Sequence, residues 1–444
     1  MSNSNRSTFG IVFLTIFLDM VGFSIIFPLF PAMLDHYLFL EESMGGGILS
    51  RFVIWVGGFG NDTITGNTAF RLETVIFGGI LGSLYAVLQF FFAPIWGGLS
   101  DRFGRKPILL FTLTGTAVGY FLWIMAGDFW ILLLSRVIGG MAGGNISVAT
   151  AAIADVTSRE KRSKGMAFVG IAFGLGFVLG PALGGIASQW DWSGSDLVFF
   201  GMHPFSAAAT ISFCLAVINF LWLWIGFQET LPTEKRSLSN SFLPAVCNMG
   251  KVTSPDARRT CMTYLLYMVS FSGMEFTLTF LAVERFSFSP QELGQMFLLI
   301  GGTLILVQGF VVRRFVGRIG ERNMAHMGIF IGVFAFLVIS SAHSYIWFYP
   351  GLFLMSSGVA LISPTLTALT SLSSKDSEQG LNLGIFRSCG SIARSIGPIT
   401  AGLIYFTYGS TTAYLVGAIW LVFPGLVLLA VKQSAGTRSL ASAH

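Results

Sequence analysis

The chain has 444 residues, of which 53% are hydrophobic and only 11% are charged, and its formal net charge at pH 7 is +5. A soluble domain carries about 25% charged residues, so this composition excludes an ordinary water-soluble protein and indicates an integral membrane protein. The sequence contains neither a Gly-rich phosphate loop ending in Lys-Ser or Lys-Thr nor an HExxH motif. An ATP-driven pump, a metalloprotease or another enzyme therefore lacks support, and no cofactor or metal is expected.

Twelve apolar stretches are predicted to cross a membrane as helices, because about 20 consecutive apolar residues span a bilayer. The first stretch contains an acidic residue, and no small-residue cleavage site follows it. It is therefore expected to remain as a span rather than to be removed as a signal peptide. In chain order, the predicted spans are 9–34, 73–97, 107–126, 130–152, 164–187, 205–228, 260–284, 290–312, 324–341, 345–370, 384–407 and 411–432.

The positions of the cationic residues predict the orientation of these spans. Cytoplasmic loops of membrane proteins are enriched in Lys and Arg, and most of the 26 Lys and Arg residues lie at the termini or in loops that follow an even-numbered span. The chain is expected in a plasma (inner) membrane, and the positions of the cations predict that both termini are cytoplasmic. This placement explains the positive net charge without a nucleic-acid partner. The exceptions are Arg51, Arg71 and Arg285 in the opposite loops, and Arg136 and Arg394 within spans.

Two predicted loops are longer than the others and suggest the domain organisation. Residues 35–72 form an outer loop, whose apolar stretch 52–59 is expected at the membrane surface. Residues 229–259 are polar and basic, and are predicted to be a cytoplasmic linker. This linker divides the chain into an N-terminal half, 1–228, and a C-terminal half, 260–444, with six spans each.

Two short motifs recur at nearly the same distance along the chain. The loop residues Arg102, Gly104 and Lys106 have a weaker echo in the segment 318–322, and the segment Gly180-Pro181-Ala182-Leu183-Gly184-Gly185 recurs in the related segment 397–402. Two matches at nearly one offset favour duplicated six-helix halves. Transporters with parallel halves place the substrate site between them.

Asp19 and Arg136 are the charged residues within the spans of the first half. Asp19 lies about ten residues into its span, roughly 15 Å deep at the rise of an α-helix. An acid there costs about 2.5–3.5 kcal/mol on insertion scales, so it must face a partner or a watery cavity. Asp19 is interpreted either as a proton site or as a structural ion pair. Arg136 is its predicted counter-charge, acting either in coupling or as a brace between helices.

Glu275 and Arg394 are the corresponding charges of the second half. Glu275 is a candidate second protonation site or partner for a cationic substrate group, and Arg394 could hold an anionic group; the two could equally neutralise each other. Gln89 and Asn145 are uncharged polar residues within spans. They are candidates for lining a substrate cavity, and interhelical hydrogen bonding is the alternative.

The turn between the second and third spans is a candidate gate. Its glycines, Gly97 and Gly104, allow two helix ends to approach closely, and Arg102 and Arg105 are among its cations. Asp101 could cap a helix or pair across the junction. We expect it to act as a latch that holds the inner gate closed.

A second candidate gate lies in the fifth span. Pro181 removes a helix hydrogen bond, and Gly180 beside it permits bending or close packing. The pair is interpreted either as a kink that shapes the outer gate or as a tight-packing seam.

Side chains near the ends of spans have simpler interpretations. His203 and His343 are expected to be wet at outer span ends, without a ligand or relay role. The cysteines lack metal-ligand spacing and are expected to be small buried hydrophobic residues without disulfides; they are Cys214, Cys247, Cys261 and Cys389.

Together, these segments resemble a known family. The segment 97–107 resembles the loop between the second and third helices of major facilitator superfamily transporters. The segment 176–185 resembles the fifth-helix motif of the antiporters, 135–140 the fourth-helix signature, and 17–19 the first helix of the tetracycline-exporter group. The segment 229–232 is also typical of the family. The chain is thus similar to the drug:proton antiporters of the superfamily, closest to the tetracycline exporters.

This resemblance implies an all-α membrane protein with twelve transmembrane helices in two pseudo-symmetric six-helix halves. It also implies a transporter that exports a lipophilic or amphiphilic organic compound by alternating access, driven by protons. A facilitator or symporter for a metabolite, sugar or lipid remains the alternative, and a receptor on a transporter scaffold is a more distant one. The expected partners are a small-molecule substrate, protons and membrane lipids. A monomer is expected, although the sequence does not determine the oligomeric state.

Overall fold

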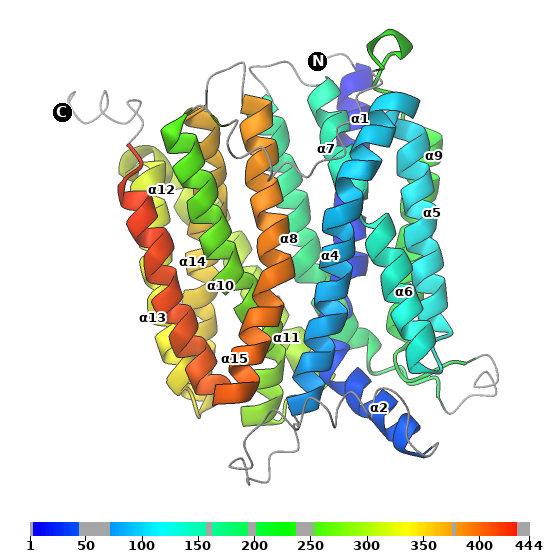
Figure 1. The fold of residues 1–444 in the computed structure, drawn as a ribbon, viewed down its shortest axis with the longest axis vertical. Coiled ribbons are helices and arrows are strands. Elements are labelled where there is room, and N and C mark those ends of the chain that lie inside the picture. The colour runs from blue at the N-terminus through cyan, green and yellow to red at the C-terminus, as the bar shows by residue number, and fades with distance from the viewer. Residues whose placement is uncertain are drawn as a thin grey trace. The chain divides into compact units, whose positions relative to one another are not determined.

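The computed structural model describes residues 3–43, 72–156, 162–193, 201–236, 252, 254–374 and 379–432, and every regular element in them is a helix (Figure 1). Contacts divide the chain into two compact units. Unit 1 comprises Met1–Leu243 and Leu278–Leu298, and unit 2 comprises Pro244–Thr277 and Leu299–His444. The division into halves 1–228 and 260–444 stays a prediction.

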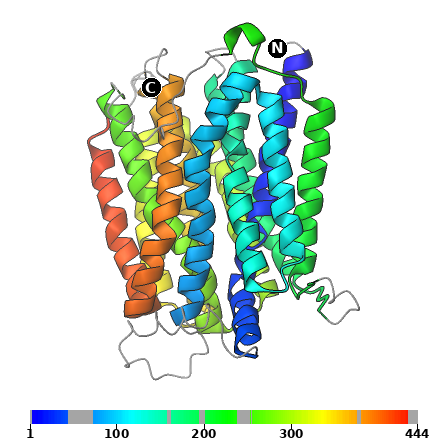
Figure 2. The ribbon, with the colours of Figure 1, turned by 45° about the vertical axis from the view of Figure 1, so that its right-hand side comes forward.

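Unit 1 is built around the first helix, α1, which packs against α8 and α9, while α5 packs against α6 and α9. A short 3₁₀ turn (Phe27–Leu29) leads from α1 into α2, which continues beyond the lower end of α1 in both views (Figures 1 and 2). The helices are α1 (Asn3–Ser24), α2 (Phe30–Ser43), α4 (Leu72–Phe103), α5 (Arg105–Ile124), α6 (Phe129–Ala142), α7 (Asn145–Val156), α8 (Arg162–Ala187) and α9 (Ser206–Gly226), with a second 3₁₀ turn at Thr233–Lys235.

Unit 2 is built around α13, which packs against α14 and α15. The segment between α11 and α12 is π-helical at Val307–Val312, and α10 and α11 each contribute residues to both units. The helices are α10 (Pro255–Phe286), α11 (Pro290–Leu306), α12 (Arg313–Ile319), α13 (Glu321–Ser341), α14 (Tyr345–Leu372) and α15 (Gln379–Leu429).

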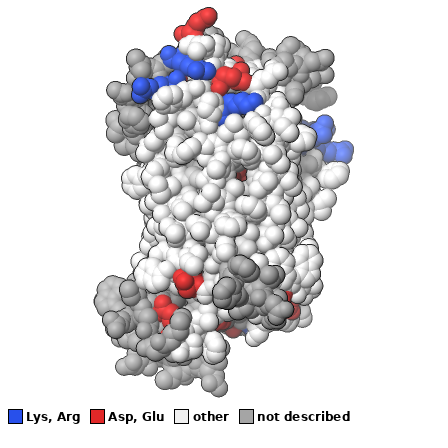
Figure 3. All heavy atoms as spheres, turned by 90° about the vertical axis from the view of Figure 1, so that its right-hand side faces the viewer, with Lys and Arg blue, Asp and Glu red and all other residues white. Residues whose placement is uncertain are grey.

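The helices agree with the predicted spans except where glycine or proline interrupts them. Among the described residues, nine helices are long and apolar enough to cross a membrane. On the face drawn in Figure 3, the coloured charged side chains lie mainly toward the two ends, with a broad belt of uncharged residues between them. The predicted outer loop 35–72 is wrong at its two ends, because α2 remains helical to Ser43 and α4 begins at Leu72; residues 44–71 lie outside the described residues.

Proline and glycine explain the interruptions. Pro28 lacks a backbone N–H, and the chain forms a 3₁₀ turn there instead of continuing α1. The fourth predicted span is divided at Gly143, between α6 and α7. The eleventh and twelfth predicted spans form one element, α15, with a kink at Gly409, whose φ of 85° is unfavourable for other residues.

Side chains from α4 donate hydrogen bonds to backbone carbonyls at the division between α6 and α7. Gln89 Nε2 donates a 2.6 Å hydrogen bond to the carbonyl of Gly143, and Trp96 Nε1 donates a 2.7 Å bond to that of Met141. These carbonyls lie at the end of α6, where helical partners are missing. Gln89 therefore acts as an interhelical link here, which was the alternative to a cavity-lining role.

The crossing of α1 and α8 depends on glycine. Ser24 Oγ donates a 3.2 Å hydrogen bond to the carbonyl of Gly176. A Cβ on Gly180 would contact Ser24 Oγ and lie 2.5 Å from the carbonyl oxygen of Val21. The Gly180-Pro181 segment is thus a tight-packing seam in this structure.

The same crossing recurs in unit 2 between α10 and α15. Ser272 Oγ donates a 3.0 Å hydrogen bond to the carbonyl of Ala393. A Cβ on Gly397 would contact Ser272 Oγ and lie 2.6 Å from the carbonyl oxygen of Val269. Gly397 is the residue that the sequence repeat aligns with Gly180, so the repeat extends to the contacts that hold each helix pair together.

Three side chains from other segments form hydrogen bonds with backbone carbonyls at the C-terminal end of α5. Tyr37 Oη donates to the carbonyl of Ala126 at 2.6 Å, His203 Nε2 lies 2.8 Å from that of Trp123, and Ser206 Oγ donates to that of Ile124 at 2.8 Å. The backbone N–H of Phe205 donates to His203 Nδ1 at 3.2 Å. An accepting Nδ1 leaves Nε2 as the donor, so these contacts fit the neutral imidazole.

His203 is therefore not the wet side chain expected from the sequence, since it is only 2% exposed. Burial lowers its pKa to about 4, and the neighbouring His36 acts in the same direction. His343, in contrast, is exposed as expected. Of the cysteines, Cys261 and Cys389 are buried and unpaired, Cys214 is exposed on α9 contrary to expectation, and Cys247 lies outside the described residues.

The first prediction concerns the α1–α8 seam. Replacing Gly180 with Ala forces α1 and α8 apart, and overpacking of this kind typically costs about 1–3 kcal/mol. We expect a lower melting temperature for purified Gly180→Ala. Gly174→Ala in the same helix is the control, because nothing lies within 4 Å of its Cβ position. Equal melting temperatures for the two variants would contradict the seam.

The second prediction concerns His203 and pH. Because its pKa is about 4 in the folded chain and about 6.5 when unfolded, the unfolded state binds more protons between these values. Stability is therefore lost as pH falls from about 6.5 to about 4, by up to about 3 kcal/mol. The melting temperature of His203→Gln should decline less over this range than that of the unsubstituted chain. His343→Gln should behave like the unsubstituted chain, and a His203→Gln profile parallel to it would disprove the burial effect.

Candidate functional site

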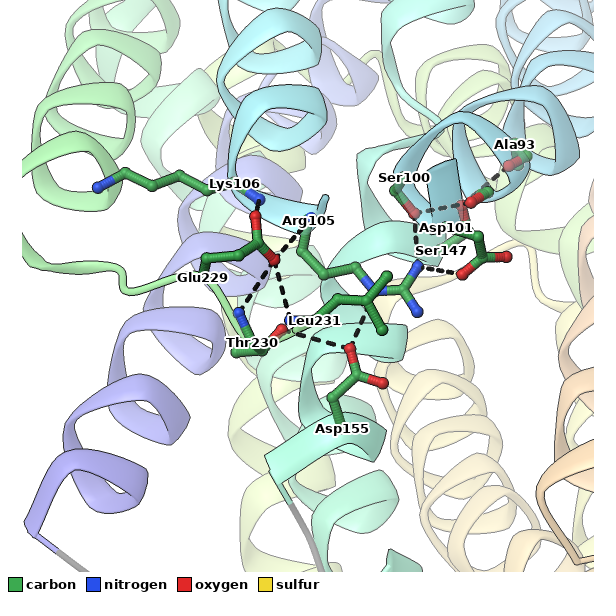
Figure 4. Close-up of polar contacts among 11 residues, drawn as sticks. Ala93, Ser100, Asp101, Arg105, Lys106, Ser147, Asp155, Glu229, Thr230 and Leu231 are labelled. Atoms are coloured by element: carbon green, nitrogen blue, oxygen red, sulfur yellow. Dashed lines mark hydrogen bonds and ion pairs between the residues drawn. The ribbon is translucent and has the colours of Figure 1, made fainter. Parts of the chain in front are cut away.

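Arg105, the first residue of α5, is the centre of an ion cluster at one end of unit 1 (Figure 4). Its side chain is only 7% exposed and forms ion pairs with Asp101 of α4 at 2.6 Å and with Asp155 of α7 at 2.9 Å. Its guanidinium also donates to Ser100 Oγ at 2.6 Å. The two carboxylates offset the cost of burying this guanidinium, and through them Arg105 joins α4, α5 and α7.

Glu229, which follows α9, binds the N-terminus of α5 beside this cluster (Figure 4). Its carboxylate accepts hydrogen bonds from the backbone N–H groups of Arg105 at 2.9 Å and Lys106 at 3.1 Å. It also accepts from the N–H groups of Thr230 and Leu231, each at 3.0 Å. A carboxylate at this position satisfies free helix N–H groups and interacts favourably with the helix dipole. The end of α9 is thereby held against the start of α5.

Gly104 makes room for this carboxylate. Its φ of 104° is unfavourable for residues other than glycine, and a Cβ there would collide with Glu229 Oε2. Gly320, its counterpart in the repeat, has a similar φ of 83° directly before α13. The weak loop echo in the sequence therefore corresponds to the same backbone geometry in both units.

The other residues predicted for the gate lie at the edge of the cluster. Arg102 is exposed and its guanidinium lies 5.1 Å from the ring centre of Phe103, rather than in the ion-pair network. Gly97 accepts a 2.7 Å hydrogen bond from Ser100 Oγ. Of the two interpretations of Asp101, pairing across the junction agrees with its ion pair to Arg105. The capping role at the start of α5 belongs to Glu229 instead. The latch function of Asp101 stays a prediction.

Asp19 lies inside unit 1, with its side chain 5% exposed. The side chain of Asn145, the first residue of α7, is close enough to interact with the carboxylate. Asp19 Oδ2 and both polar atoms of the Asn145 side chain have no hydrogen-bond partner among the described residues. Unpaired buried polar atoms are rare, and each calls for an explanation such as a catalytic role, a water molecule or an ion.

Arg136 of α6 is buried against an aromatic ring rather than a carboxylate. It is 4% exposed, its guanidinium lies 4.7 Å from the ring centre of Trp123, and Nε donates to Ser135 Oγ at 3.2 Å. Tyr37, Tyr85 and Tyr120 are within electrostatic range of it. A cation over the face of an indole ring is stabilised by the charge distribution of the ring.

The predicted direct ion pair between Asp19 and Arg136 is wrong for this structure. Among the described residues, no ion pair joins the two side chains, and Tyr85 and Tyr120 each lie within electrostatic range of both. The physical reason is that the Trp123 ring and neighbouring hydroxyl groups stabilise Arg136, which leaves Asp19 opposite a neutral amide. The roles of both residues in proton coupling stay predictions.

Glu275 of α10 and Arg394 of α15 lie near each other in unit 2, and the carboxylate attracts the guanidinium. Both side chains are half-buried. Their proximity agrees with the interpretation that they neutralise each other, and it leaves open a role for either in binding a substrate.

Sequence reasoning missed three features of these sites. Tyr85 and Tyr120, which interact with both Asp19 and Arg136, carry no local signal in the sequence. Glu229 belongs to the segment 229–232, which is typical of the family, but its capping role cannot be recognised from that segment alone. The third feature was visible: Met-Val-x-Phe-Ser occurs at 20–24 and again at 268–272. This match places Tyr267 of the second copy at the position of Asp19.

Comparisons with known proteins decide the family. The model of the Major Facilitator Superfamily matches residues 12–398. The chain belongs to this superfamily. "Major facilitator superfamily domain-containing protein 10" of Mus musculus is 34% identical, with 98% of this chain and 95% of the relative covered. "Tetracycline resistance protein, class H" of Pasteurella multocida is 27% identical, with 96% and 94% covered.

A solved structure supports the same assignment. The crystal structure of the human organic anion transporter MFSD10 (TETRAN) has a TM-score of 0.76 and 32% sequence identity, with 96% of this chain and 99% of the solved chain covered. The major facilitator superfamily chain described here is thus a multi-pass membrane transporter of small molecules, and not an enzyme. Its predicted all-α, twelve-helix fold and its similarity to tetracycline exporters are confirmed.

The third prediction tests the ion cluster. Replacing Arg105 with Gln leaves Asp101 and Asp155 without their shared cation. Because these two side chains are 45% and 21% exposed, water offsets part of the loss, and the cost is smaller than the about 3–5 kcal/mol of a fully buried pair. We expect Arg105→Gln to lower the substrate transport rate in proteoliposomes at least tenfold, and to lower the melting temperature. Arg102→Gln is the matched control, with an exposed guanidinium outside the network. Similar rates for the two variants would exclude a special role for Arg105.

Proposed function

We propose that the chain is a proton-coupled secondary transporter that exports a lipophilic or amphiphilic organic compound by alternating access. In this proposal it acts in the plasma (inner) membrane with both termini in the cytoplasm. Asp19 carries the proton, and Arg136 responds to its charge. The single observation that carries the proposal is a buried carboxylate with an oxygen that has no hydrogen-bond partner among the described residues.

The surroundings of Asp19 support a protonation site rather than a brace. A buried carboxylate in an ion pair must break that pair to accept a proton, which costs several kcal/mol. Asp19 faces the neutral amide of Asn145 instead, and an amide can donate to a carboxylate or accept from a carboxylic acid. Both protonation states can therefore be accommodated without moving another charge.

Tyr85 and Tyr120 provide the link to Arg136. Both are within electrostatic range of Asp19 and of Arg136. Removing the negative charge of Asp19 changes the potential at these hydroxyl groups and at the guanidinium. A change of this kind biases a transporter between two states only if the contacts differ between them.

The relatives support the substrate class. Some are named for tetracycline resistance, and one solved relative is described as an organic anion transporter. We extend to this chain the class that the two descriptions share, an organic compound. Gating by Asp101, Gly97 and the Gly180-Pro181 seam is part of the same proposal.

The fourth prediction tests proton coupling. In proteoliposomes that contain the full chain, an imposed pH gradient should drive accumulation of tetracycline or fluorescein. Asp19→Asn removes the titrating group, so gradient-driven flux should fall at least tenfold, while exchange at equal pH and equal substrate concentration should continue.

Asp128→Asn is the matched control for this experiment. Asp128 caps α6 by accepting from the N–H of Ile131 at 3.0 Å, and asparagine caps a helix equally well. This variant should keep gradient-driven flux. Flux that ignores the pH gradient in the unsubstituted chain would instead support the facilitator alternative.

A further inference from the structure

We infer that α10 and α15 of unit 2 form a binding site for the anionic group of an aromatic organic anion. Arg387 and Arg394 supply the positive charge, and the hydroxyl groups of Tyr264 and Tyr267 supply hydrogen-bond donors. This inference rests on the proposed transport function, and it assigns the recognition of the substrate charge to one helix pair.

The position of Tyr264 brings these groups together. Its ring stacks on that of Phe386, with the centroids 3.9 Å apart. A Cβ on Gly390 would lie 2.8 Å from the ring and 3.2 Å from the hydroxyl oxygen. Arg387 and Arg394 are three residues before and four residues after Gly390, so they share one side of α15, near this hydroxyl. Both guanidinium groups are within electrostatic range of Tyr264.

The Tyr267 hydroxyl group can accept a further hydrogen-bond partner, such as a ligand. Tyr267 is 3% exposed, and its Oη has no hydrogen-bond partner among the described residues. Tyr267 and Tyr264 are within electrostatic range of each other. A buried hydroxyl without a partner carries a free-energy penalty that a bound acceptor removes. Guanidinium and hydroxyl groups together are suited to a carboxylate or sulfonate, since all of them donate and the anion only accepts.

The internal repeat shows that the two copies differ at these positions. Tyr267 corresponds to Asp19 in the repeated Met-Val-x-Phe-Ser segment, and Arg387 and Arg394 correspond to Gly170 and Phe177 in the α8 segment. The first copy thus carries an acid where the second carries a phenol, and it lacks both arginines. Proton binding and anion binding are assigned to different copies of one architecture.

Glu275 acts as an internal competitor of the substrate. It is within electrostatic range of Tyr267 and attracts Arg394. A substrate anion that approaches Arg394 must replace part of this attraction. Glu275 therefore weakens anion binding, and its removal should strengthen it. The ring of Phe271, stacked with Tyr267 at 5.8 Å, and that of Phe386 provide apolar surface for the aromatic part of the substrate.

The test compares two dyes with a similar xanthene skeleton and opposite charge, anionic fluorescein and cationic rhodamine 123. Binding to the purified full chain is measured by fluorescence anisotropy at pH 7.5. We expect tighter binding of fluorescein than of rhodamine 123. Arg394→Gln and Arg387→Gln should each weaken fluorescein binding at least tenfold, and Tyr267→Phe about threefold. Glu275→Gln should strengthen it about threefold, a gain that misfolding cannot produce.

The control is Arg318→Gln, an exposed arginine of unit 2, which should leave fluorescein binding unchanged. Absent fluorescein binding, an equal preference for rhodamine 123, or unchanged fluorescein affinity in both Arg387→Gln and Arg394→Gln would overturn the inference. The measurement of flux under a pH gradient, with Asp19→Asn as its variant, separates this inference from the proposed function. If fluorescein binding depends on the arginines but flux ignores the pH gradient, the proton-coupled function fails and the anion site stands.

Discussion

The structure of unit 1 depends on the hydrogen-bond partners of the backbone N–H and carbonyl groups at the two ends of α5. A helix in a membrane leaves N–H groups unpaired at one end and carbonyl groups at the other, and lipid cannot bond them. Glu229 accepts from the N–H groups of the first turn, and Tyr37, His203 and Ser206 bond the carbonyls of the last residues. These partners come from the end of α9, from α2 and from the start of α9. Because α5 is held at both ends, the Arg105 cluster and the Trp123 ring beneath Arg136 have fixed positions on it.

A second constraint is the glycine crossing that occurs once in each unit. In both copies a serine donates to a carbonyl of the partner helix, one turn before a Gly-Pro pair whose glycine has no room for a Cβ. The repeated contact holds the helix pair, while the side chains on the neighbouring faces are free to differ. Five residues before this serine, the first copy carries Asp19 and the second carries Tyr267. One packing solution thus supports two chemical environments, an acid that faces an amide and a group of tyrosines beside arginines.

The charges in the interior of unit 1 are stabilised by different means. Arg105 is neutralised by two carboxylates, whereas Arg136 is stabilised by an aromatic ring and a hydroxyl group. Asp19 has a neutral neighbour and one oxygen without a partner among the described residues. A carboxylate in a tight ion pair resists protonation, while one that faces an amide can gain or lose a proton with little rearrangement. The absence of an Asp19–Arg136 pair therefore suits the proposed proton carrier better than the pair expected from the sequence.

The sequence by itself determined the membrane class, the spans, the candidate charged residues and the family, because hydropathy and short motifs are local properties of the chain. It also contains the internal repeat, including the Met-Val-x-Phe-Ser match of the first and second copies. Only the tertiary structure decided which side chains meet. Arg105 and Glu229 are 124 residues apart, and the partners of Asp19 and Arg136 depend on how α1, α4, α5, α6 and α7 are rotated against one another. Helix rotation and crossing follow from packing along whole helix faces, and no single residue or motif encodes them.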